Sequence, residues 1–453
     1  MNLILTKSKL TDLRKLINFG KYFLISLLLL LGLHLAAHAN NPEVIIQPEW
    51  TADLKASTQL ITNGEQVFVI EDVKDSVEPK DRSATLFAIN TASGKVQWQQ
   101  KLPFRQDLGS RQLILENETI YVSHDDGVTG FNLKTGSLKT SFNYANINSS
   151  GSRDRLMGLH QDILVYGDSI PLDKSDLSRT EYQTKVFGIT KDKTIWSYQL
   201  PKNGLIGGIS SIEPVVQNGI LFLPSRHKTN TGLMEQFTGM DVTSGKVMWT
   251  WEAPRKSDSS DLRSADVLGD TLFYYTSGFD HSKMQSSGRL RAIDLKTGKE
   301  KWSYVMTDET NGQTKAVSDR EVLVWESKNN VGGNFLVLDK ETGKFLRRFS
   351  APLGYYAAFQ PLIWADGRIY IEALEPKDET LDFSDSARNS WLGAFDDKTG
   401  KLVWRTPSLI NSSNDYPPVI SAVADKSEKK RLIFASNFFG IEGGSKIQSF
   451  LIP

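Results

Sequence analysis

The segment Asp-Leu-Lys-Thr-Gly-Lys-Glu-Lys-Trp at residues 294–302 recurs along the chain and decides its fold. We call this segment the turn phrase. Near-complete copies occupy residues 90–98, 241–249 and 396–404, and degenerate copies begin at Asn132, Thr190 and Asp339. The copies lie about 40 to 60 residues apart, a spacing typical of proteins built from one repeated supersecondary unit. The chain is therefore expected to be a repeat protein.

Each copy of the turn phrase has the chemistry of a tight β-hairpin. The Asp or Asn that opens it accepts hydrogen bonds from the backbone of the turn, and the Gly supplies the left-handed conformation that the turn needs. The Trp that closes it lies on the following strand, where it can pack against the neighbouring unit. Two degenerate copies carry Thr140 and Arg347 in place of Trp. The residues predicted to be structural on this basis are Gly94, Gly136, Gly245, Gly298, Gly343, Gly400, Trp98, Trp196, Trp249, Trp302 and Trp404.

A second series of signals sets the number of units at eight, because apolar strands preceded by polar turns begin near residues 66, 119, 162, 220, 271, 321, 368 and 431. The eighth unit lacks a fourth strand after Leu451, whereas segment 44–54 is an unassigned strand that carries the expected tryptophan, Trp50. Joining the two ends in one blade removes the exposed sheet edges of an open array. The prediction is an all-β, eight-bladed β-propeller of four-stranded antiparallel blades, whose N-terminal strand joins the C-terminal blade.

The pattern Ala-x-Asp-x-x-Thr-Gly-Lys-x-x-Trp resembles the repeat of the pyrroloquinoline-quinone-like (PQQ-like) β-propeller superfamily, over nearly the whole chain after residue 39. That superfamily contains quinoprotein dehydrogenases and also non-enzymatic periplasmic proteins, among them the BamB-type outer-membrane assembly factors. The resemblance implies the propeller fold. It does not choose between these two functions, because one fold serves many.

The N-terminal segment 1–39 has the features of a signal peptide. Five basic residues precede the apolar stretch 22–37, and Ala37-His38-Ala39 fits a small-x-small cleavage site. Cleavage after Ala39 is expected, leaving residues 40–453 as a single propeller domain that is periplasmic or exported. The alternative is an uncleaved anchor, although the apolar run is shorter than the roughly 20 residues of a spanning helix. After cleavage no direct membrane span is expected.

The chain contains no cysteine. A lipoprotein of the usual bacterial kind needs a cysteine at its cleavage site, so a lipoprotein of that kind is excluded. The quinoprotein alcohol dehydrogenases of the superfamily typically carry a disulfide between adjacent cysteines near the cofactor, which is also excluded here.

The charge balance gives no sign of nucleic-acid binding. The chain has 53 basic and 53 acidic residues, and the part after residue 39 carries a net charge of about −4. A nucleic-acid-binding domain would need a basic face.

Binding residues are expected on one face of the propeller. The loops between second and third strands, such as 168–182, 225–236 and 277–288, are long and share a face with the blade-to-blade connections. We call this the loop-rich face, and the opposite face, which carries the turn phrases, the short-turn face. Variable loops on a rigid scaffold are where binding residues concentrate.

The connections on the loop-rich face contain two sets of candidates. Arginines can bind a carboxylate, a phosphate or an acidic peptide, or form ordinary surface ion pairs with neighbouring aspartates. Exposed apolar and aromatic residues suit a protein interface, or cap the blade cores. The interaction-face candidates are Arg105, Arg111, Arg153, Arg155, Arg263, Leu205, Ile206, Tyr355 and Tyr356.

No catalytic or metal-ligating residue can be selected. The four histidines after residue 39 have no ligand spacing, and no nucleophile elbow, Walker loop or dinucleotide fingerprint is present. A quinoprotein needs a calcium and an Asp base drawn from separate blades, so no local motif would reveal them. Trp325 and Trp364 lie outside the turn phrases and can form a stacking floor for a flat ligand, although such residues usually belong to the core.

The leading hypothesis is an exported, non-catalytic, monomeric scaffold without a cofactor. It would bind envelope proteins, as BamB-type factors do in outer-membrane assembly. The alternative is a PQQ-dependent (quinoprotein) dehydrogenase or quinone-binding sensor, with PQQ and calcium as cofactors. A third hypothesis, binding of an envelope polysaccharide, has no residue-level support.

Overall fold

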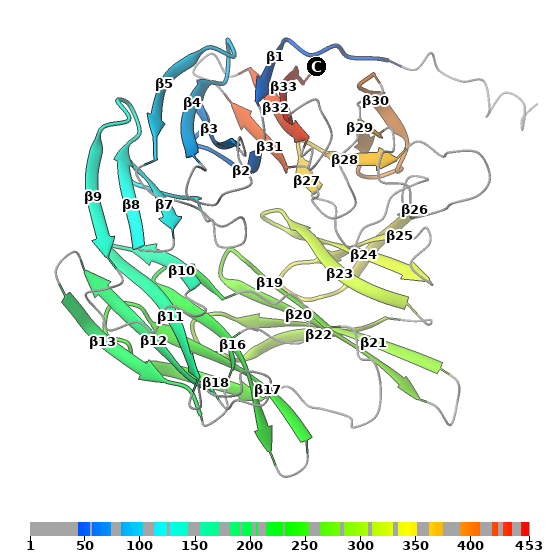
Figure 1. Ribbon diagram of the computed structural model, residues 1–453. Helices are drawn as coiled ribbons and strands as arrows, with labels where there is room; N and C mark the ends of the chain where they lie inside the picture. Colours follow the sequence, from blue (N-terminus) through cyan, green and yellow to red (C-terminus); the bar gives the residue numbers. More distant parts are fainter. Residues whose placement is uncertain are drawn as a thin grey trace, which may run out of the picture. The chain divides into compact units, whose positions relative to one another are not determined.

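The structure is a computed structural model that describes residues 44–54, 57–73, 83–102, 113–124, 127–143, 155–171, 182–190, 193–201, 205–206, 214–229, 232–252, 263–280, 285–306, 310–328, 334–350, 362–374, 390–407, 419–424, 429–436 and 445–452. Met1–Ile45 and Ile46–Pro453 are separate compact units, and the fold described below is that of the second. Its described residues form strands and turns and no helix (Figure 1).

The strands form eight sheets, each of which is one blade. Blade 1 consists of β2 (Ser57–Thr62), β3 (Gln66–Val73), β4 (Ser83–Asn90) and β5 (Val96–Lys101). Blade 2 consists of β6 (Leu113–Glu116), β7 (Thr119–His124), β8 (Gly127–Asn132) and β9 (Leu138–Asn143). Blade 3 consists of β10 (Arg155–His160), β11 (Ile163–Pro171), β12 (Tyr182–Thr190) and β13 (Lys193–Gln199). In blade 4 the first strand is split into β14 (Leu205–Ile206) and β15 (Val215–Gln217), followed by β16 (Ile220–Thr229), β17 (Gly232–Asp241) and β18 (Val247–Glu252).

Blades 5 to 7 repeat the four-stranded pattern. Blade 5 consists of β19 (Arg263–Leu268), β20 (Thr271–Asp280), β21 (Gln285–Asp294) and β22 (Glu300–Met306). Blade 6 consists of β23 (Thr310–Val317), β24 (Glu321–Lys328), β25 (Asn334–Asp339) and β26 (Phe345–Ser350). Blade 7 consists of β27 (Leu362–Ala365), β28 (Arg368–Leu374), β29 (Ser390–Asp396) and β30 (Leu402–Arg405). Blade 8 consists of β31 (Val419–Ala424), β32 (Lys430–Ser436), β33 (Ser445–Leu451) and the N-terminal β1 (Trp50–Leu54).

The ring closes through the N-terminal strand. β1 pairs antiparallel with β33, from Trp50 opposite Ser449 to Leu54 opposite Ser445. The first strands of successive blades lie side by side: β2 contacts β31 and β6, and β23 contacts β19 and β27. The predicted eight-bladed propeller, including its closure in the last blade, is therefore confirmed.

Consecutive blades interlock through the tryptophan of one and the turn phrase of the next. The indole nitrogen of Trp302 donates a 2.7 Å hydrogen bond to the carbonyl of Lys340, the residue after Asp339 in the next turn phrase. Gly343 of that phrase has φ +67°, and a Cβ there would lie 2.5 Å from the Trp302 ring. A side chain at this position is thus excluded by both backbone conformation and space. The equivalent indole bonds are Trp50 to Thr91, Trp98 to Leu133, Trp196 to Val242 and Trp249 to Leu295, all between 2.7 and 2.9 Å.

The carboxylate that opens a turn phrase holds the turn together. Asp396 Oδ1 accepts hydrogen bonds from the amide of Thr399 at 2.8 Å and from its hydroxyl at 2.7 Å. The hydroxyl bond is the main reason that the pKa of Asp396 lies below its usual value, and Thr342 does the same for Asp339. For Asp241 the main cause is the hydroxyl of Thr243, followed by that of Ser244.

We expect these three carboxylates to contribute to acid unfolding. Their folded pKa lies below the usual 3.8, so their stabilisation is complete above that value and is lost as the pH falls through the lower folded values. We expect the variant with Asp241, Asp339 and Asp396 all replaced by Asn to lose less free energy of unfolding than the wild type when the pH falls from about 5 to about 2, as measured by denaturant titrations. Asn90 already makes the same turn contacts, so the fold should persist. The control is Asp319→Asn, in an exposed turn outside the phrase; a triple variant with the wild-type pH profile would contradict the prediction.

Candidate functional site

Two of the expected loops on the loop-rich face are paired strands instead. β16 and β17 pair without interruption from Ile220–Asp241 to Thr229–Gly232, so the ladder runs through the segment 225–236. β20 and β21 likewise pair from Thr271–Asp294 to Asp280–Gln285. We call these two hairpins the ribbons of blades 4 and 5. Both extend well beyond the rest of their blades in Figure 1.

The ribbons are specific to some blades. In blade 2 the ladder between β7 and β8 ends after six pairs, whereas the blade 4 ribbon has ten. At about 3.4 Å per residue, the four additional pairs extend it by roughly 14 Å. In blade 3 the ladder of β11 and β12 reaches Pro171 opposite Tyr182. The loop-rich ends of blades 4 and 5 thus carry the longest second-to-third hairpins among the described residues, and the eight-pair ladder of blade 3 equals that of β3 and β4 in blade 1.

Three of the predicted interaction segments lie at this end of the same three blades. Arg155 begins β10 opposite Gly167, and Arg263 begins β19 opposite Thr276. Leu205 and Ile206, expected in a connection, form β14 and pair with Arg226 and Ser225 of the blade 4 ribbon. β14 also contacts β11 and β12 of blade 3. The remaining candidates, Arg105, Arg111, Arg153, Tyr355 and Tyr356, lie outside the described residues.

Buried acidic residues near the loop-rich ends of second strands were not predicted as site residues. Asp168, Glu326 and Glu372 are 1%, 3% and 1% exposed. Glu326 forms a 3.1 Å ion pair with Arg348, which fixes the arginine on the outer strand of blade 6. Burial raises the pKa of the neighbouring Tyr304, and the charge of Arg348 opposes that rise. The sequence signal is an acidic residue that closes an apolar run, as in Val-Leu-Val-Trp-Glu at 322–326.

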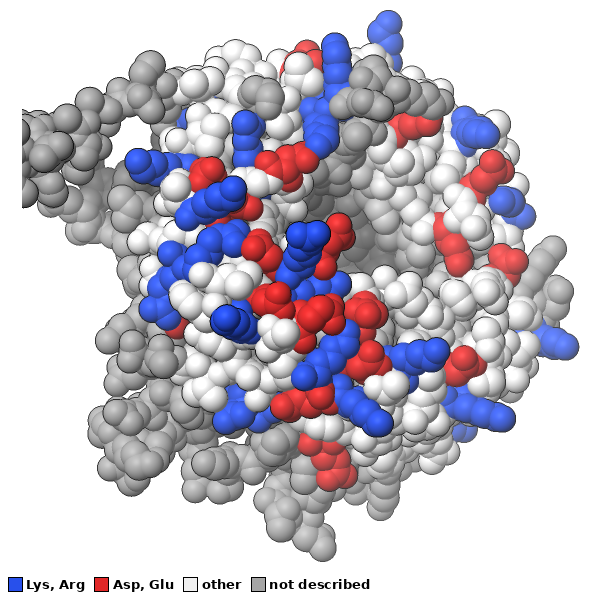
Figure 2. Space-filling view, turned by 180° about the vertical axis from the view of Figure 1, so that it is seen from behind, with Lys and Arg blue, Asp and Glu red and all other residues white. Residues whose placement is uncertain are grey.

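The charged side chains on the surface are mixed in sign. Seen from behind, Lys and Arg alternate with Asp and Glu over the described surface, and neither sign forms a broad patch there (Figure 2). Among the described residues, no group of three or more His, Cys, Asp or Glu is placed to hold a metal ion. The described part of the chain also has no helix long and apolar enough to cross a membrane.

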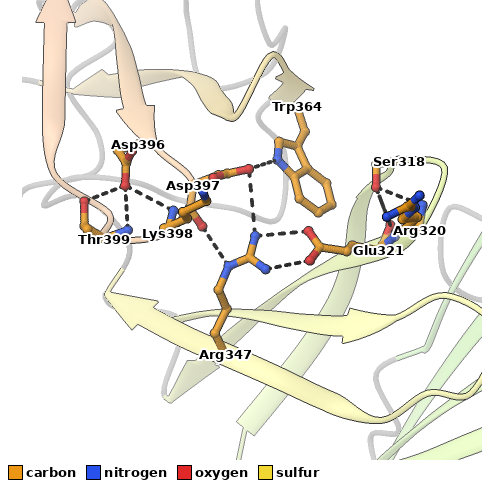
Figure 3. A network of polar contacts seen from close by, with 9 residues as sticks. All are labelled: Ser318, Arg320, Glu321, Arg347, Trp364, Asp396, Asp397, Lys398 and Thr399. Atoms are coloured by element: carbon orange, nitrogen blue, oxygen red, sulfur yellow. Dashed lines mark hydrogen bonds and ion pairs between the residues drawn. The ribbon is translucent and has the colours of Figure 1, made fainter.

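A polar network replaces the tryptophan between blades 6 and 7 (Figure 3). Arg347, at the tryptophan position of β26, donates two hydrogen bonds to Glu321, at 2.7 and 3.1 Å. Its Nε donates to the carbonyl of Asp397 at 3.1 Å, which is the acceptor position used by the indoles elsewhere. The carboxylate of Asp397 accepts a 2.8 Å bond from the indole of Trp364. Trp364 is thus tied into a blade junction, and Trp325 is 3% exposed in the adjoining core.

Comparisons with known proteins match the repeat region. A family model described as outer membrane protein assembly factor BamB matches residues 47–169 and 167–331. Over 179 residues the chain is 26% identical to the dehydrogenase subunit of alcohol dehydrogenase (quinone) from Gluconobacter oxydans. That match covers 37% of this chain and 22% of the relative, so the chain spans less than a quarter of that protein's length.

Solved structures of two kinds resemble the chain. The crystal structure of BamB from Moraxella catarrhalis aligns over 73% of this chain and 97% of its own, with 13% identity and a TM-score of 0.37. A europium-containing methanol dehydrogenase aligns over 90% of this chain and 93% of its own, with 12% identity and a TM-score of 0.39. Both scores are below 0.5, and we draw nothing about function from these two likenesses.

Proposed function

This chain belongs to the family of outer membrane protein assembly factor BamB, and on that premise we propose that it is an exported, non-catalytic scaffold of the bacterial cell envelope. It binds envelope proteins with the loop-rich ends of blades 3, 4 and 5, as a monomer in the periplasm and without a cofactor. The observation that carries this proposal is the placement of Arg155, β14 and Arg263 at the loop-rich ends of blades 3, 4 and 5, with β14 and Arg263 paired to the strands of the two ribbons.

The ribbons suit a protein partner for a geometric reason. Among the described residues β18 ends at Glu252, opposite Gln236, so residues 232–235 of β17 have no described partner on that side. A strand edge of this kind can accept an extended segment of another protein by backbone pairing. The β16 strand contributes Arg226, His227 and Lys228 to the same ribbon, in which Glu235, opposite Arg226, is the one acidic residue between 226 and 235. An acidic partner segment is therefore the complementary choice.

Shortening the blade 4 ribbon tests this proposal. Residues 227–234 are deleted and Arg226 is joined to Glu235 by an Asn-Gly turn, which retains the pairing of Arg226 with Leu205. Crosslinking in intact cells, followed by mass spectrometry, should show at least about a tenfold loss of captured envelope protein, the equivalent of 1.4 kcal/mol. Melting temperature should be close to that of the wild type.

The control for the ribbon experiment is Lys134→Glu, a charge reversal in a turn phrase on the opposite face. It should leave the crosslinks unchanged. Full crosslinking by a folded, ribbon-shortened protein would contradict the assignment of this surface.

The match to the quinone alcohol dehydrogenase subunit favours a second candidate, a quinoprotein dehydrogenase or quinone-binding sensor. PQQ in such enzymes is held against a calcium ion with oxygen ligands. Adding PQQ and calcium and following dye reduction and the melting temperature separates the two candidates. A sub-micromolar quinone site would replace the scaffold proposal.

A further inference from the structure

The N-terminal end of the propeller contacts three blades within one short segment. The amide of Ile46 donates a 2.9 Å hydrogen bond to the carbonyl of Arg405, at the end of β30 in blade 7. The strand β1 that follows pairs with β33 in blade 8. The indole of Trp50 donates to the carbonyl of Thr91 in blade 1. We call residues 46–54 the clasp, because they join the two ends of the ring.

The junction between blades 7 and 8 lacks the indole hydrogen bond found at other junctions. Trp404, the tryptophan of blade 7, is 1% exposed, and its indole nitrogen has no hydrogen-bond partner among the described residues. The tryptophans of five other blades donate to the blade that follows. Blade 8 carries no turn phrase that could supply the acceptor. A cavity of about 400 Å³ also lies at this junction, and its lining includes Asp366 and Tyr370 of blade 7 and Lys430 and Ile452 of blade 8.

The start of the clasp supplies contacts at this junction instead. Ile46 packs against the core that contains Trp404 of blade 7 and Phe450 of blade 8. Arg431 of blade 8, which is 4% exposed, donates a 2.6 Å hydrogen bond from Nε to the carboxylate of Glu49. The amide of Glu49 donates to the carbonyl of Ser449 at 2.7 Å. Loss of a partner from a buried charge costs more than loss of a surface ion pair, so Ile46 and Glu49 attach the clasp to blades 7 and 8.

The clasp has no local turn to hold it in register. The outer strands of the other seven blades each follow the third strand of the same blade through a short turn. In blade 8, by contrast, Trp50 lies opposite Ser449 with nearly the whole domain between them in the sequence. Closing so long a loop costs conformational entropy, and segments near a chain end open at the lowest free energies. The clasp is therefore the part of the ring with the least local support.

We propose that the clasp is a separate opening unit, which detaches from blades 7 and 8 while the other blades stay folded. Ile46 and Glu49 determine how often it detaches. Each detachment frees the edge of β33 for pairing and leaves blades 7 and 8 without the contacts that replace the indole bond. This device requires nothing of the ribbons or of the scaffold function.

Hydrogen exchange on the whole protein, followed by mass spectrometry of its peptides, tests the proposal. The strands β33 and β1 of blade 8 correspond to β21 and β22 of blade 5, so the two pairs are matched in position within the blade. The amides of β1 and β33 should exchange at least about tenfold faster than those of β22 and β21. Equal protection of the two pairs in the wild type overturns the proposal.

Variants locate the opening. Glu49→Gln should raise the exchange of β1 and β33 by a further factor of about three to ten and leave blade 5 unchanged. Glu118→Gln, which removes an exposed ion pair with Lys134, is the matched control and should change neither. Trp404→Phe has no indole bond to lose and should raise exchange at its junction by less than about twofold, whereas Trp302→Phe should raise exchange at its own by about fivefold.

Three results with these variants overturn the proposal. The first is a Glu49→Gln protein in which all blades exchange faster to the same extent, because the clasp would then open only in global unfolding. The second is a Glu49→Gln protein whose β1 and β33 exchange at the wild-type rate. The third is equal sensitivity of the two junctions to Trp404→Phe and Trp302→Phe.

Discussion

Replacement of Trp302 by alanine is expected to lower the free energy of unfolding by about 3–5 kcal/mol, the range for deleting a buried large aromatic side chain. Trp302 is 7% exposed and belongs to the core between blades 5 and 6, where its ring lies 6.1 Å from that of Phe273. Its removal opens a cavity beside Gly343 and also leaves the carbonyl of Lys340 without its indole donor. The two losses act at the same blade junction.

Guanidinium unfolding of matched variants separates these two effects. Trp302→Phe retains most of the apolar volume but removes the indole nitrogen, so it should cost less than alanine, with about 1 kcal/mol from the hydrogen bond. Val305→Ala, on the same strand but 50% exposed, should change the stability by less than about 0.5 kcal/mol. A loss for Trp302→Ala no larger than that for Val305→Ala would contradict the role of the tryptophan in joining the blades.

The fold could be predicted from the sequence because each unit carries its own local chemistry. The hydrogen bonds from Thr297 to Asp294 and the left-handed Gly298 involve only residues close together in the sequence. The turn phrase can therefore be recognised in a single sequence. Closure was predictable for a related reason. The indole of Trp50 donates to the carbonyl of Thr91 in the next blade, as the indoles of the phrase tryptophans donate to the blades that follow them.

Even the degenerate copies follow this logic. Thr140 replaces tryptophan in blade 2, and the next blade is the one whose phrase, from Thr190 to Lys193, is shortened and lacks the glycine. The tryptophan of one blade and the glycine of the next are therefore lost together.

The ribbons could not be predicted in the same way. The segment 225–236 contains Asn230-Thr231-Gly232 and several charged residues, which favour a loop by composition. Its strand pairing is nevertheless continuous through Thr229 and Gly232. Likewise, nothing in the spacing of Arg155, Leu205 and Arg263 shows that they start neighbouring first strands. That relation comes from the order of the blades around the ring, which joins residues distant in the sequence.

Arg347 appeared in the sequence only as a failed copy of the tryptophan, and the structure gives it a specific role. Its Nε takes over the donor function of the indole at the carbonyl of Asp397. Phe349 takes over the packing, because it is the side chain nearest to Gly400, 2.9 Å from where a Cβ would lie. Arg347 and Phe349 thus divide between them the hydrogen bond and the packing that one tryptophan provides in other blades. Glu321 neutralises the positive charge of Arg347.

Arg347→Ala is therefore expected to destabilise the protein by about 2–4 kcal/mol. It leaves the carboxylate of Asp397, a residue 7% exposed, without its nearby cation, and also removes the donor to the Asp397 carbonyl. Arg347→Trp restores the phrase but should not restore the stability, since Phe349 already lies against Gly400.

A double-mutant cycle with Glu321→Gln isolates the ion pair that Arg347 forms within blade 6. The two side chains are 24% and 27% exposed, so we expect a coupling energy of about 1–2 kcal/mol, below that of a fully buried pair. The same cycle on Lys134 and Glu118, which are 80% and 68% exposed, should give less than about 0.5 kcal/mol. Equal coupling energies in the two cycles would mean that Arg347 stabilises the junction only through its contact with Asp397. A larger value for Arg347 and Glu321 means that the ion pair within blade 6 helps to hold the guanidinium where it contacts Asp397 of blade 7, a position that five other junctions fill with a tryptophan.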